Sequence, residues 1–110
     1  GSGAIEGNPM LKYPYYFNSI RNKISEQWNP PPLSQTARGK GTAVAIIAFI
    51  VTPSGHINKN SVKVEKSSGN IFFDTSALRA VYNSNPLLPL PGEIMEDIHV
   101  HFEFKLNLGS

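Results

Sequence analysis

The sequence predicts an α+β fold, a two-layer sandwich with two helices packed on one face of a three-stranded antiparallel or mixed sheet. Three observations support it. Apolar residues recur at helical spacing over 13–28, residues 42–52 form an unbroken apolar and β-branched run, and apolar and polar residues alternate strictly over 98–108. With a hairpin partner at 57–66 and a second helix at 72–83, the order of elements is α-β-β-α-β.

Length and composition limit the class of protein. The 110 residues, 40% hydrophobic and 16% charged, are enough for one folded domain and too apolar for a disordered chain. The net charge, 10 − 8 = +2, is too small to indicate a nucleic acid or an anionic membrane as partner. The absence of cysteine excludes thiol catalysis, disulfides and cysteine-ligated metals. Residues 1–9 have the composition of a vector-derived linker, so we expect a single domain at 10–110.

The first helix is expected at 15–27. Its apolar side chains follow one another in steps of three, one, three, four and four, which places them on one helical face, and we expect Phe17 and Trp28 to lie in the core with the rest. Asn29 and the three prolines that follow it end the helix, because proline has no N–H to donate and disfavours helical geometry in the residue before it.

A hairpin follows the first helix. The run 42–52 is apolar at both parities, which is typical of a strand that is central in its sheet or covered on both sides. Pro53, Ser54 and Gly55 are turn residues, and the strand 57–66 returns after them. The two strands therefore pair as neighbours.

The second helix is expected at 72–83, with Asn70 or Asp74 as its cap, and a proline-rich extended segment at 86–92 follows it. The third strand, 98–108, then returns parallel to the second. A right-handed crossover leaves room for the first strand between them, so the predicted sheet order is 2-1-3. In that order the outer backbone edge of 98–108 has no partner, and an unpaired edge is either protected or used.

No catalytic constellation is present, so we do not expect an enzyme. The serines at 67 and 68 have no base at a recognisable spacing, and the carboxylates at 93, 96 and 97 fall in a polar connection. His99 and His101 share one face of the third strand, which makes a small ligand-binding or metal-binding domain the alternative function. We expect neither a metal nor a cofactor.

Several short motifs, taken in order, resemble the C-terminal domain of the TonB/TolA energy-transducer family. The resemblance covers about 13–106. It rests on Trp28-Asn29-Pro30-Pro31, Thr52-Pro53-Ser54-Gly55-His56-Ile57, Val64-Glu65-Lys66-Ser67-Ser68-Gly69-Asn70, Phe73-Asp74-Thr75-Ser76-Ala77-Leu78-Arg79-Ala80, Pro86-Leu87-Leu88-Pro89-Leu90-Pro91 and His101-Phe102-Glu103-Phe104.

The resemblance implies a periplasmic module of a Gram-negative cell envelope, tethered to the inner membrane through an N-terminal anchor and driven by a motor complex. Such a domain binds a TonB-box-like segment of an outer-membrane receptor, or Tol-Pal proteins, by β-strand addition, and transmits energy derived from the proton-motive force. TolA-type domains often carry a cysteine pair, and TonB-type domains often carry a Trp-x-Tyr-x-Pro run where Tyr82 to Pro86 stand here. The choice between the two branches stays open.

Strand addition places the binding site on the third strand. Main-chain groups along an open edge bind an incoming strand without a sequence requirement, and side chains at alternate positions select among partners. We expect the backbone of Val100 to Phe104 to donate and accept, and the polar side chains to read the partner. The predicted partner-binding residues are His99, Val100, His101, Phe102, Glu103, Phe104 and Lys105. We expect no nucleic acid and no small-molecule substrate.

Overall fold

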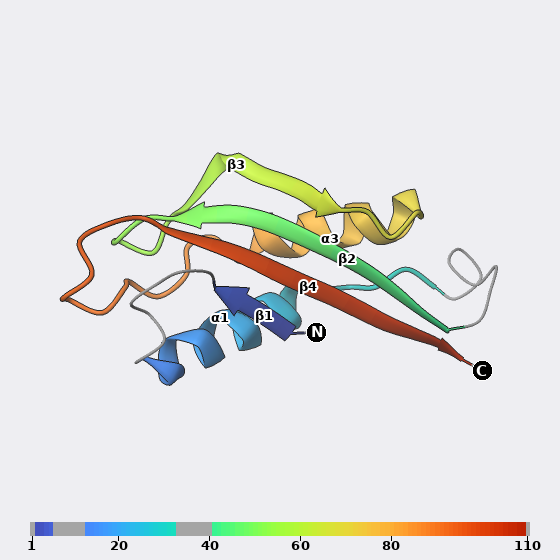
Figure 1. Cartoon of the computed structure of the whole chain (residues 1–110), viewed down its shortest axis with the longest axis horizontal. Helices are drawn as coiled ribbons and strands as arrows, with labels where there is room; N and C mark the ends of the chain where they lie inside the picture. Colours follow the sequence, from blue (N-terminus) through green and yellow to red (C-terminus); the bar gives the residue numbers. More distant parts are fainter. Residues whose placement is uncertain (1, 6–12, 33–40, 110) are drawn as a thin grey trace.

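The computed structural model describes residues 2–5, 13–32 and 41–109. Within these residues, two helices and four strands follow one another (Figure 1). They are β1 (Ser2–Ile5), α1 (Pro14–Gln27), β2 (Gly41–Val51), β3 (Ile57–Lys66), α3 (Ile71–Asn83) and β4 (Ile98–Gly109). The five elements predicted from the sequence are all present, and their bounds agree with the prediction to within one residue.

The four strands form one sheet in the order β1-β4-β2-β3, and each neighbouring pair is antiparallel. Its three long strands have the predicted order, with β2 in the centre and β3 and β4 running parallel to each other on either side. The prediction that the outer edge of β4 has no partner was wrong, because β1 pairs with it. The sequence predicts a vector-derived linker outside the domain at 1–9, and residues 2–5 of that segment lie in the sheet.

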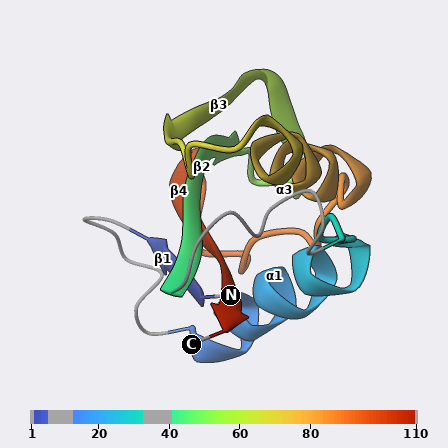
Figure 2. The same ribbon diagram turned by 90° about the vertical axis from the view of Figure 1, so that its right-hand side faces the viewer.

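Both helices lie on the same side of the sheet (Figure 2). Between the two layers, apolar side chains from every long element form one continuous core. β2 contributes Ala45, Ile47, Phe49 and Val51, and β4 contributes Ile98, Val100, Phe102 and Phe104, so each strand buries every second residue. The strict alternation along 98–108 therefore predicted the buried face of β4 correctly.

The helix α1 starts with Pro14 in its first turn, where a missing N–H costs nothing, and buries Tyr16, Ile20 and Ile24. Phe17 and Trp28, expected in the core, are only partly buried and pack against its rim. The Trp28 ring meets Phe104 edge-on at 5.2 Å between ring centroids, and its indole N–H donates to the Ser76 hydroxyl at 3.1 Å. Trp28 therefore fastens the end of α1 to α3.

The helix α3 is capped by Asn70, whose side chain accepts from the Phe73 N–H at 3.0 Å. Asp74, the other candidate cap, has a different role. Its carboxylate accepts from the hydroxyls of Ser67 and Ser68 and from the Ser68 N–H. This buried carboxylate holds the loop after β3 against the first turn of α3, where the helix dipole also favours a negative charge.

The proline-rich segment after α3 lies against the β2–β3 turn. The Leu87 N–H donates to the Gly55 carbonyl and the Leu90 N–H donates to the Pro53 carbonyl, both at 2.9 Å. Leu87, Leu90 and Ile94 are buried, so this segment closes one end of the core. The extended conformation was expected for this segment, but its share in the core was not. Neither helix is long and apolar enough to cross a membrane, as judged over the described part of the chain.

Candidate strand-docking edge

The outer edge of β4 carries the seven residues predicted to bind a partner. β2 pairs with β4 along its whole length, from Gly41 opposite Gly109 to Val51 opposite Ile98. On the other side of β4, the four residues of β1 pair only with Val100 to Glu103. Val100, Phe102 and Phe104 bury their side chains in the core beneath the sheet, so these side chains are not available to a partner strand.

The direction of the backbone groups of β4 follows from its neighbour β2. The Ile50 N–H donates to the Ser61 hydroxyl of β3 at 2.8 Å, and the Thr52 N–H donates to the His56 carbonyl at 2.9 Å. Even-numbered residues of this segment therefore direct their N–H groups toward β3. Because backbone groups alternate in side along a strand, the odd-numbered residues of β2 face β4.

Ile47 lies opposite Phe102 and Phe49 lies opposite Val100, so even-numbered residues of β4 bond to β2. The odd-numbered residues then direct their N–H and C=O groups toward the outer edge. They are His99, His101, Glu103 and Lys105. The sequence alone could not assign this parity, because it depends on which strand lies on each side of β2.

The same four residues project their side chains from the open face of the sheet, away from the helices, and are exposed or partly exposed. The His101 Nδ1 lies 2.5 Å from Oε1 of Glu65, across the small side chain of Ala48. A shallow depression of about 310 Å³ lies beside this pair and is lined by both residues and by His99. An incoming strand would therefore meet paired polar side chains beside its backbone partners.

The alternative function would place a metal or a small ligand at His99 and His101. His101 contacts Glu65, which sequence reasoning did not single out, and no group of three or more His, Cys, Asp or Glu side chains close enough to hold a metal occurs among residues 2–5, 13–32 and 41–109. The sequence of 57–66 could not predict the contact of Glu65, because the irregular pairing of β3 with β2 decides which of its side chains reach β4.

The two tyrosine hydroxyls at the start of α1 fix that helix to the proline-rich segment and the connection beyond it. Tyr16 donates to the Leu88 carbonyl at 2.6 Å, and its burial raises the pKa of the phenol to about 12. Tyr13 donates to the Glu93 carboxylate, and this hydrogen bond raises the pKa of Tyr13 to about 12. Both hydroxyls therefore stabilise the packing of α1 against the segment after α3.

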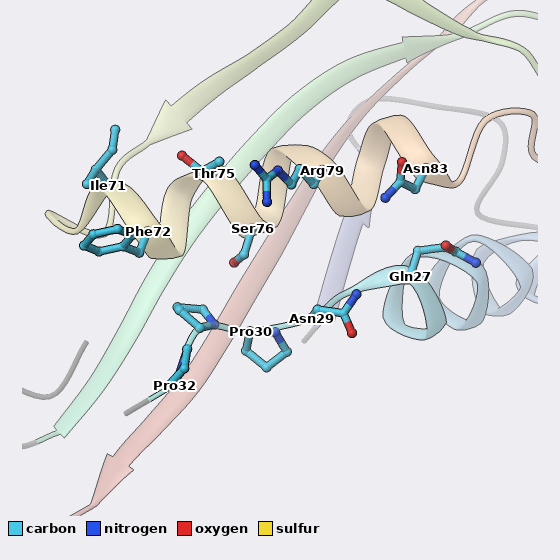
Figure 3. Close-up of a pocket in the computed structure, with 11 residues that line it drawn as sticks. Gln27, Asn29, Pro30, Pro32, Ile71, Phe72, Thr75, Ser76, Arg79 and Asn83 are labelled. Carbon is cyan, nitrogen blue, oxygen red and sulfur yellow. The ribbon is translucent and has the colours of Figure 1, made fainter. Parts of the chain in front are cut away.

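A second concave surface lies between α3 and the end of α1 (Figure 3). It has a volume of about 510 Å³. Phe72 and Pro32 line one end of it, and Asn83 and Gln27 line the other (Figure 3). Among the described residues that line it, Arg79 alone is charged. No sequence motif pointed to this groove, and it lies on the helix layer, away from the open face of the sheet.

Comparisons with known proteins agree with this fold. The sequence profile of the TonB C-terminal domain family matches residues 13–104. A curated relative, the protein TonB of Pasteurella multocida, is 29% identical over 101 residues, which cover 92% of this chain. The chain spans 38% of the length of that relative.

Two solved structures share the fold. The TonB C-terminal domain of Helicobacter pylori aligns with a TM-score of 0.66 at 22% identity, covering 100% of this chain and 99% of its own. The TolAIII domain, solved in complex with a peptide from the N-terminus of TolB, aligns with a TM-score of 0.62 at 24% identity, covering 94% of this chain and 78% of its own. The chain belongs to the TonB/TolA family and is a C-terminal domain of that family.

Proposed function

We propose that this domain is the periplasmic C-terminal part of a TonB/TolA-type energy transducer and that it binds partner segments by β-strand addition on β4. The partners are a TonB-box-like segment of an outer-membrane receptor or a segment of a Tol-Pal protein. In the full-length protein an inner-membrane anchor would connect the domain to a motor complex. The domain would then transmit energy derived from the proton-motive force as a pull on the bound segment, with no catalytic step.

The observation that best supports this proposal is the pairing of β1 with β4. Four residues with the sequence Ser-Gly-Ala-Ile form an antiparallel ladder with Val100 to Glu103. A segment this short, with mostly small side chains, is held by main-chain hydrogen bonds, which are the source of affinity in strand addition. The TolAIII domain, which shares this fold, was solved with a peptide from the N-terminus of TolB, and this supports the binding of a peptide segment by the domain.

Selection among partners would fall to the side chains on the open face beside the edge. His99, His101, Glu103 and Lys105 combine two imidazoles, one carboxylate and one ammonium group. A partner strand that lies beside β4 presents every second side chain to this row. Opposite charges facing Glu103 and Lys105 would favour one register of the partner strand over its neighbours.

A peptide panel tests the proposal. Synthetic peptides would represent the periplasmic N-terminal segments of the outer-membrane receptors and of the Tol-Pal proteins encoded in the source genome, titrated into ¹⁵N-labelled protein. We expect at least one peptide to bind, with the largest amide shifts at His99, His101, Glu103 and Lys105. Shifts confined to the groove beside Phe72, or no binding by any peptide, would contradict the proposal.

Two variants at one position separate backbone from side chain. His101→Pro removes an N–H that faces the outer edge, and proline is tolerated at such positions, so we expect a folded protein that no longer binds the peptide. His101→Ala removes the same imidazole and keeps the N–H, so it should still bind. If both variants bind as the parent does, β4 is not the docking edge.

A further inference from the structure

The partner edge of β4 is already occupied in this structure. β1 lies antiparallel to β4 with Ser2 opposite Glu103 and Ile5 opposite Val100 (Figure 1). The two residues of β1 that face outward-directed positions of β4 are Ser2, opposite Glu103, and Ala4, opposite His101. Because odd-numbered residues of β4 direct their N–H and C=O groups outward, these are the two hydrogen-bonded pairs of the short ladder.

We infer that β1 is a resident strand that competes with the partner, so that a partner segment must displace residues 2–5 before it can pair with Val100 to Glu103. This inference rests on the proposed function, because it assigns a regulation to the same edge. β1 and a partner strand would require the same N–H and C=O groups of His101 and Glu103. Both strands cannot hold these groups at once.

The length of the ladder favours displacement over permanent closure. β1 has four residues, whereas β4 has twelve and is paired with β2 over its full length. In the ladders between described residues, β4 beyond Glu103 pairs with β2 alone. A partner strand longer than β1 could therefore begin to pair near Lys105 and then replace β1 pair by pair toward Val100.

The opposite edge of the sheet offers a poor alternative. The outer strand there is β3, which carries Lys59, Lys63 and Lys66 as exposed side chains. Lysines on an edge strand oppose the approach of another strand. β3 also departs from regular pairing with β2 in two places, which twists that edge. The edge of β4 is the longer and more regular of the two, and it is the one that β1 covers.

The tether makes β1 an effective competitor despite its size. Residues 6–12 join β1 to the start of α1 in the same chain, so the strand meets β4 at an effective concentration on the order of millimolar. An apparent dissociation constant equals the intrinsic one divided by the fraction of molecules with a vacant edge. If β1 occupies the edge in nine molecules of ten, partner affinity falls by about tenfold.

Proline variants of the full chain test the inference. Ala4→Pro removes the N–H that faces His101 and places the proline ring against β4, so it should release β1. Gly3→Pro is the matched control, because by parity its N–H faces away from β4 and its ring would point outward. The first measurement is amide hydrogen exchange at His101 and Glu103. We expect protection in the parent and in Gly3→Pro, and loss of protection in Ala4→Pro, while the Phe102 amide stays protected by β2.

The second measurement is the binding of an acetylated octapeptide with the sequence of residues 1–8, monitored by ¹⁵N chemical shifts. Both measurements are made at 50 and 500 μM protein. We expect Ala4→Pro to bind about tenfold more tightly than the parent and Gly3→Pro to match the parent. Equal binding by all three proteins, or unprotected His101 and Glu103 amides in the parent, would overturn the inference. Protection that rises with protein concentration would also overturn it, because β1 would then pair between chains.

The same experiments distinguish a failure of the proposed function from a failure of the inference about β1. If the edge amides of Ala4→Pro are exposed and the octapeptide still does not bind at millimolar concentration, while the receptor and Tol-Pal peptides also fail, strand addition itself is excluded. If those longer peptides bind the parent and Ala4→Pro equally, the proposed function holds and the competition by β1 is refuted.

Discussion

At the scale of single residues, the fold depends on a few positions where geometry allows one residue type. Gly55 is one of them. It adopts a φ of +92° in the β2–β3 turn, donates its N–H to the Thr52 carbonyl and accepts from the Leu87 N–H. A Cβ on this residue would meet the backbone carbonyls of Leu87 and Leu88. Both the positive φ and the approach of the proline-rich segment therefore require glycine.

Gly55→Ala should destabilise the domain more than the same change at Gly69. Gly69 also has a positive φ, +88°, but a Cβ there would meet nothing within 4 Å. Gly69→Ala should cost about 1–2 kcal/mol for the left-handed conformation alone, and Gly55→Ala about 1–3 kcal/mol more for the clash. Urea unfolding of the two variants measures the difference, and equal midpoints would show that the proline-rich segment does not pack on the turn.

Tyr16 predicts how stability depends on alkaline pH. Burial raises its pKa in the folded state to about 12 from the ordinary value of 10.0 for a tyrosine, so the unfolded chain ionises first as the pH rises. The stability that the neutral phenol provides is complete below pH 10 and is lost as the pH rises through 12. Thermal midpoints of the parent should therefore fall more steeply across this window than those of Tyr16→Phe.

At the scale of elements, each helix has one face in the core, and neighbouring residues can differ completely in their contribution. Phe73 of α3 is fully buried and stacks edge-on against Trp28, while Phe72 is 51% exposed on the rim of the groove. Phe73→Ala should lower the free energy of unfolding by about 3–5 kcal/mol, and Phe72→Ala by less than about 1 kcal/mol. Urea unfolding tests this pair, and similar losses would mean that α3 is rotated relative to its position here.

The elements predicted from the sequence are those whose buried residues recur at the regular spacing of a helix or a strand. The helical spacing of Tyr16, Ile20 and Ile24 and the alternation along 98–108 each report a contact with one shared core, so they identified α1 and β4. β1 could not be found this way. Four residues without an alternating pattern carry no period, and their place depends on main-chain pairing with β4. The parity of β4 and the His101–Glu65 contact likewise depend on the order and register of the neighbouring strands.

At the scale of the whole molecule, the two faces of the sheet differ in what covers them. In the described part of the chain, the helices cover one face, and the residues of the other face are bordered by side chains of neighbouring strands. The central strand β2 buries Ala48 there and half-buries Val44, Ile46 and Ile50. This explains why residues 42–52 are apolar at both parities: the strand is central in the sheet, so the side chains of its neighbours border it on the second face as well. The polar residues of β4 border this apolar stripe, so a strand added at the edge would widen the sheet without uncovering the core.

The stability of the whole domain should not depend on a metal ion. Its core is one continuous apolar cluster that draws on both helices and three strands, and none of these contacts needs a ligand to close. We expect the thermal midpoint to be the same with and without EDTA. Added zinc should shift it equally in the parent and in a variant with both His99→Ala and His101→Ala. A midpoint that falls by several degrees with EDTA, or that rises with zinc in the parent and not in the double variant, would establish the histidine pair as a metal site and support the alternative function.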